Sequence, residues 1–68
     1  MTKTEMRSWM KRVREDLREA ERLLRTYAHI EDCQAELYDL FADASGSAAE
    51  LQNATAAVNP YHQYEDEG

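Results

Sequence analysis

The sequence predicts an all-α fold, a helical hairpin packed like a short coiled coil. Apolar residues recur at alternating spacings of four and three over the first half of the chain, which is the heptad pattern of a coiled coil. Glycine and proline, which interrupt helices, number only two and one, and none of them occurs before residue 46. The 68 residues allow one domain at most, which we expect over residues 1–60.

One long helix is expected over residues 4–44. Thr2 followed by Glu5 matches the capping box that begins a helix. The first apolar series then contains Met6, Met10, Val13, Leu17, Ala20, Leu24 and Tyr27. A second series is shifted by one residue and contains Leu23, Tyr27, Ile30, Gln34, Leu37, Phe41 and Ala44. The absence of turn residues favours one continuous, kinked helix, whereas a break near residue 29 would give a three-helix bundle.

A turn is expected at residues 45–47, where Gly46 stands between two serines. Ser47 followed by Glu50 matches a second capping box, so a short return helix is expected over about residues 48–58. Pro60 ends it. Residues 61–68 are predicted to form an acidic, flexible tail.

Positive and negative residues occupy different parts of the chain. The net charge is −6, from eight basic and fourteen acidic residues. All eight basic residues lie in the first 25 positions together with five acids, whereas positions 26–68 hold nine acids and no lysine or arginine. This asymmetry indicates that the acidic part meets another molecule.

The main candidate site is an acidic ridge of four residues, Asp32, Glu36, Asp39 and Asp43. Their spacings of four, three and four place them on one helix face over about 16 Å. A row of carboxylates without nearby cations can imitate nucleic-acid phosphates and occupy a basic groove on another protein. The alternative is a solvated helix face, because the ridge lies opposite the second apolar series.

Five further residues are secondary candidates for binding a partner. Glu31 and Glu50 extend the acidic field, and Trp9 is a large apolar side chain that so small a chain does not easily cover. Tyr61 and Tyr64 belong to the acidic tail, which is either a docking segment or a solubilising one.

Direct binding of nucleic acid is not expected. A basic stripe exists and contains Arg7, Lys11, Arg14, Arg18 and Arg25. The negative net charge and the five acids in the same segment argue against contact with phosphates. Such charges beside an apolar seam instead set the partner and orientation of a coiled coil, which makes a homodimer an open alternative.

Catalysis, cofactors and metals are not expected either. His29 and Cys33 are four residues apart, which is at best half of a zinc site, and no scaffold for orienting a nucleophile accompanies them. A single cysteine forms no disulfide framework. Neither a membrane span nor a signal peptide is recognisable, so a cytoplasmic location is expected.

The sequence therefore predicts a non-enzymatic inhibitor or adaptor that binds a larger protein. In its most specific form the acidic ridge blocks the basic groove of a nucleic-acid-binding complex, as an anti-CRISPR protein of a phage would. The alternative is a coiled-coil module that assembles with itself.

Overall fold

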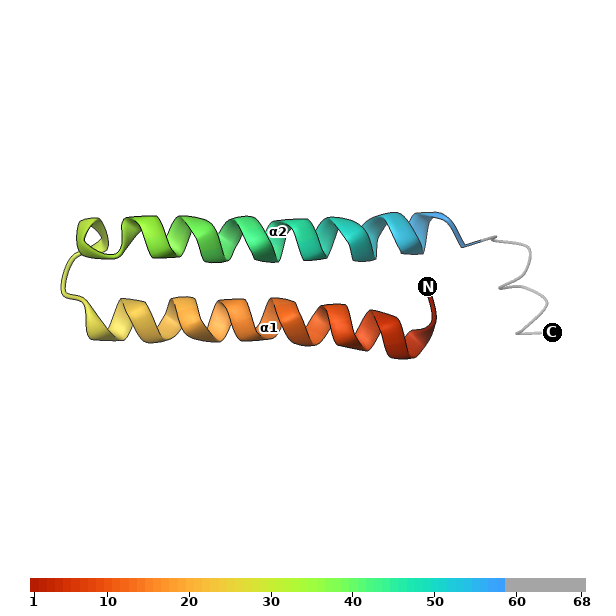
Figure 1. Cartoon of the computed structure of the whole chain (residues 1–68), viewed down its shortest axis with the longest axis horizontal. Coiled ribbons are helices and arrows are strands. Elements are labelled where there is room, and N and C mark those ends of the chain that lie inside the picture. The colour runs from red at the N-terminus through yellow and green to blue at the C-terminus, as the bar shows by residue number, and fades with distance from the viewer. Residues whose placement is uncertain (59–68) are drawn as a thin grey trace.

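The computed structural model describes residues 1–58 and shows two antiparallel helices joined by a short turn (Figure 1). Helix α1 spans Lys3–Thr26, a single turn of 3-10 helix, η1, spans Ile30–Asp32, and α2 spans Gln34–Ala56. The predicted all-α hairpin is confirmed. The predicted tail, residues 61–68, lies outside the described residues.

The predicted position of the turn is wrong. The chain reverses between Thr26 and Gln34, so neither a helix over residues 4–44 nor a separate return helix over 48–58 exists. Ser45, Gly46 and Ser47 continue α2 without interruption. Because only one of the two possible breaks occurs within residues 1–58, a three-helix bundle does not form there either.

Burial of the apolar seam explains where the chain turns. Helices α1 and α2 contain 24 and 23 residues, so each covers the other along almost its full length. A turn at residues 45–47 would leave most of a helix of about 40 residues without a packing partner, although packing supplies most of a helix's stability. The local cost of the break is small, because Thr26, Tyr27, His29 and Ile30 are weaker helix formers than the residues before them.

Both ends of α1 have identifiable caps. The capping box is present: the Thr2 hydroxyl accepts from the Glu5 N–H at 3.1 Å, and Glu5 Oε1 accepts from the Thr2 N–H at 3.3 Å. At the other end the Thr26 hydroxyl donates to the Arg22 carbonyl at 2.8 Å, and Tyr27 adopts an extended conformation. The predicted capping box of Thr2 and Glu5 is therefore confirmed, and the helix that it caps begins at Lys3.

The helices meet along a seam of alternating three- and four-residue spacings. On α1 the seam contains Met6, Trp9, Val13, Asp16, Ala20 and Leu23; from the turn through α2 it contains Cys33, Leu37, Leu40, Ala44, Ser47, Leu51 and Ala54. Three of the seven residues in the first predicted series are thus displaced by one position. Trp9, Asp16 and Leu23 occupy the seam positions predicted for Met10, Leu17 and Leu24, and Phe41 and Ile30 of the second series are exposed.

Candidate functional site

The acidic ridge is divided between two elements. Asp32 lies in η1, and Glu36, Asp39 and Asp43 lie on α2 at spacings of three and four residues. The three α2 residues project from the same side of that helix as Glu50, which lies two turns after Asp43. We refer to Asp32, Glu36, Asp39, Asp43 and Glu50 as the acidic face.

Asp43 is a structural residue rather than a free carboxylate. Arg12 reaches it from α1 and donates two hydrogen bonds, from Nη2 to Oδ1 at 2.9 Å and from Nε to Oδ2 at 3.2 Å. This bidentate geometry fixes the guanidinium and orients one helix on the other. Arg12 also lies over Trp9, with 5.9 Å from the guanidinium carbon to the ring centroid.

Asp16 completes this cluster, and the sequence analysis did not single it out. It stands at a seam position that a heptad pattern would give to an apolar residue, and its Oδ2 is buried without a hydrogen-bond partner. The neighbouring Asp43 carboxyl group, to which a protonated Asp16 can donate a hydrogen bond, and then burial raise the pKa of Asp16. The Arg12 hydrogen bond lowers the pKa of Asp43. The sequence does carry a signal for Asp16, because the spacings of Met6, Trp9, Val13, Asp16 and Ala20 are as regular as those of the first apolar series.

Replacing Asp16 with asparagine is expected to raise the thermal unfolding midpoint at neutral pH. A raised pKa in the folded state means that Asp16 favours folding below the ordinary carboxyl pKa, and that this contribution is lost as the pH rises through the folded pKa. At neutral pH the charged Asp16 is repelled by Asp43, and asparagine removes that charge. The gain should shrink as the pH falls toward about 4.

Asp43→Asn is the matched control, with the opposite dependence. Because its pKa is lowered, Asp43 favours folding above the ordinary carboxyl pKa, and the contribution disappears as the pH falls through the folded pKa. This variant should lower the midpoint at neutral pH and have little effect in acid. Thermal unfolding of both variants at the two pH values is the measurement, and a lower midpoint for Asp16→Asn at neutral pH would contradict this view of the cluster.

The remaining acidic side chains have no cation beside them within residues 1–58. The ion pairs found there join Lys11 to Glu15, Arg12 to Asp43 and Arg22 to Glu19, so Asp32, Glu36, Asp39 and Glu50 take part in none. Part of this acidity is explained by helix electrostatics, since Asp32 and Glu36 lie at the positive N-terminus of α2. Asp39 and Glu50 lie further along the helix and have no such role.

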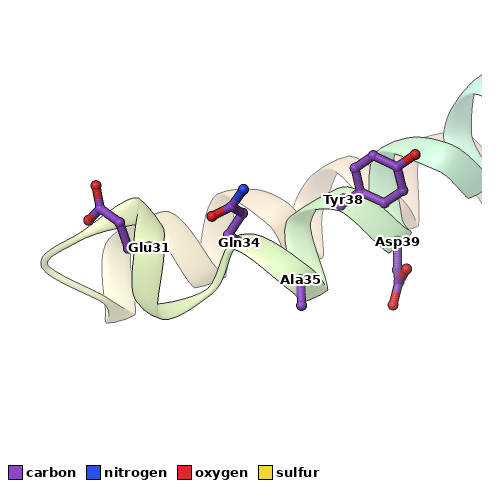
Figure 2. A pocket seen from close by; sticks show the side chains of 5 residues that line it. All are labelled: Glu31, Gln34, Ala35, Tyr38 and Asp39. Atoms are coloured by element: carbon purple, nitrogen blue, oxygen red, sulfur yellow. The ribbon is translucent and has the colours of Figure 1, made fainter.

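A shallow depression beside the turn contains two of the candidate residues. Glu31 and Asp39 line it with Gln34, Ala35 and Tyr38, and all five come from η1 and α2 (Figure 2). Glu31 and Tyr38 point to one side of the ribbon, whereas Asp39 points to the other (Figure 2). Because these groups do not converge, the depression is not organised to hold a small ligand.

Trp9 packs at the edge of the hairpin instead of standing free. It is half-buried at a seam position and lines a hollow with Arg12, Gly46, Ser47 and other residues of α2. Ser47 is 3% exposed, and its small side chain lets α2 approach the indole. Packing in the seam accounts for this tryptophan, so no partner protein is needed to explain it. Tyr61 and Tyr64, the other aromatic candidates, lie outside the described residues.

His29 and Cys33 do not form a common site. His29 is exposed before η1, whereas Cys33 is 1% exposed and packs with Ala20, Leu23 and Leu37. Burial, and then the charges of Glu36 and Asp32, raise the pKa of the Cys33 thiol, which opposes the thiolate that nucleophiles and metal ligands require. Within residues 1–58 no three histidine, cysteine or acidic side chains are grouped to hold a metal ion.

Neither helix within residues 1–58 is long and apolar enough to cross a membrane. No protein-family model, curated protein or solved structure gives a match to the chain.

Proposed function

We propose that this chain is a non-enzymatic inhibitor or adaptor that binds a larger protein through its acidic face. In the most specific form, the face occupies the basic groove of a nucleic-acid-binding complex, as an anti-CRISPR protein would. The observation that carries the proposal is that Asp39 and Glu50 are exposed on α2 without a cation or a helix terminus to stabilise them.

Two properties of the hairpin support this form of binding. Glu36, Asp39 and Glu50 lie on one long helix, so little conformational entropy is lost when they meet a basic surface. The second helix also contains no lysine or arginine, and Arg12 neutralises the face only at Asp43. The basic groove would therefore meet Asp32, Glu36, Asp39 and Glu50. Compared with the ridge expected from the sequence, Glu50 takes the place of Asp43.

A self-assembling module is the second candidate function. It is favoured by a separate observation: Met10, Leu17, Leu24 and Phe41 remain about half exposed although the hairpin has formed. These side chains lie outside the acidic face, so the two functions use different surfaces and are compatible.

The charge-reversal variant Asp39→Lys/Glu50→Lys is expected to lose the partner. The immobilised wild-type chain is exposed to a lysate of the organism that encodes it, and the retained proteins are compared with those retained by the variant. A protein that the wild type alone retains, and that duplex DNA or RNA displaces, is the expected result. Retention should also weaken as salt is added, because the contact is electrostatic.

Glu15→Lys/Glu21→Lys on α1 is the matched control, since it changes the net charge by the same amount away from the acidic face. It should retain the partner. Equal loss by both variants would show that net charge, and not the face, is responsible. Retention by the Asp39→Lys/Glu50→Lys variant would contradict the proposal, provided circular dichroism shows that both variants are helical.

A further inference from the structure

We propose that the flank of the hairpin opposite the Arg12–Asp43 pair binds a second copy of this chain, giving an antiparallel four-helix bundle. This apolar flank consists of Met10, Leu17, Leu24, Phe41 and Ala48. The large side chains among them are 47%, 48%, 50% and 48% exposed, in that order. The inference goes beyond the proposed binding through the acidic face and does not depend on it.

The heptad pattern places these residues on one side of the hairpin. Each follows a seam residue by one position and another by four; Leu17, for example, follows Asp16 and lies one turn after Val13. In antiparallel helices such positions face each other across the same flank of the seam. A groove lined by Met10 and Val13 of α1 and by Ala48 and Leu51 of α2 confirms that the two helices share this flank.

Three apolar positions per heptad are typical of a helix that faces the core of a bundle, whereas two suffice for a two-stranded seam. Within residues 1–58 the hairpin is a single layer of two helices (Figure 1). No other described element covers the third position. The third position is apolar along α1, at Met10, Leu17 and Leu24, and in the middle of α2, at Phe41 and Ala48. This part of the hairpin therefore corresponds to a larger core than one hairpin builds.

The size of the flank suits a dimer. A helix of 24 residues is about 36 Å long, and two adjacent helices are about 20 Å wide, so one broad face offers about 700 Å². A stable interface buries about 800 Å² on each partner. The core that the hairpin buries alone is small, with Leu23 and Leu37 as its only large buried side chains among residues 1–58, so a second copy also supplies packing that the monomer lacks.

The charges beside the flank select the arrangement of the two copies. The row next to it on α1 contains Arg7, Arg14 and Glu21, whereas the corresponding row on α2 contains the uncharged Tyr38, Ser45 and Gln52. Placing α1 against an antiparallel α1 of the second copy, in register, would bring the two Arg14 side chains together, and like charges at an interface are costly. Placing α1 against α2 avoids this, makes all neighbouring helices antiparallel, and leaves the acidic face accessible.

Sedimentation equilibrium of the full chain over the micromolar range tests the proposal. The wild type should be a dimer, and Leu17→Glu should weaken dimerisation by about 100-fold, because an unpaired charge would be buried. Ala49→Glu, on the exposed side of α2 away from the flank, introduces the same charge and should leave the dimer unchanged. A wild-type monomer, a larger oligomer, or an equal effect of the two substitutions would overturn the proposal.

Ser45 provides a second test that does not disturb the hairpin, because its side chain is exposed. The proposed arrangement places it level with Arg14 of the second copy. Ser45→Glu should then tighten the dimer by about 2- to 10-fold, since an exposed ion pair forms twice, and Ser45→Arg should weaken it similarly. The reverse order, or no difference, would exclude the α1-against-α2 arrangement.

The Asp39→Lys/Glu50→Lys variant should remain dimeric, which separates failure of this proposal from failure of the acidic-face proposal.

Discussion

Replacing Leu37 with alanine is expected to unfold most of the protein. Leu37 is 6% exposed and packs with Ala20, Leu23 and Cys33, the largest contiguous group of buried side chains in the hairpin. Truncating a buried leucine costs about 2–5 kcal/mol. A chain of this size has only about 3–5 kcal/mol of stability from a single core. Urea unfolding followed by circular dichroism should show a large loss of the folded baseline.

Ile30→Ala is the control for this substitution. Ile30 is a side chain of the same size but is 62% exposed in the turn, so its truncation should change the free energy of unfolding by no more than about 0.5 kcal/mol. Both measurements need one fixed protein concentration, because self-association makes apparent stability depend on concentration. Similar losses for Leu37→Ala and Ile30→Ala would show that the seam does not stabilise the fold as described.

The fold class could be predicted from the sequence because it depends on a pattern that local reading detects. The three- and four-residue spacings and the Thr2–Glu5 capping box indicated helices, and both are present. The position of the turn could not be predicted in the same way. Gly46 is a strong local signal for a helix end, but it lies within α2 because two helices of equal length bury more of each other.

The apparent register slip at Leu23 and Leu24 lies inside α1, whose seam runs without a shift from Met6 to Leu23. The slip arises because Met10, Leu17 and Leu24 lie beside that seam and not in it. Because no glycine or proline lies nearby, the sequence favours a continuous helix across this slip.

The contacts of the acidic residues could not be predicted for a similar reason. The spacing of Asp32, Glu36, Asp39 and Asp43 correctly described the α2 part of the face, which helical geometry determines. The sequence does not show that Arg12, 31 positions earlier, pairs with Asp43, because that contact depends on how the helices align. Asp16 was missed because a carboxylate in a seam is unfavourable unless a partner such as this cluster accompanies it.

Substitutions at Gly46 should distinguish the observed helix from the turn that local sequence indicates. Gly46 lies in the middle of α2, and a Cβ atom added there would meet nothing within 4 Å. Gly46→Ala should therefore stabilise the protein by about 1 kcal/mol, because alanine is the better helix former. Gly46→Pro should destabilise it by about 3 kcal/mol or more, because proline lacks the N–H that the helix uses and its ring clashes with the preceding turn.

Because the total free energy of unfolding is small, the urea midpoints of these two variants should lie far apart. Urea titrations at one protein concentration would resolve them. A glycine that ends a helix in the left-handed conformation would respond differently to alanine, which is strained there and destabilises. Stabilisation by alanine together with unfolding by proline is consistent only with a helix that runs through residue 46. That outcome would also support the acidic face, since Asp43 and Glu50 lie on one surface only if the helix between them is continuous.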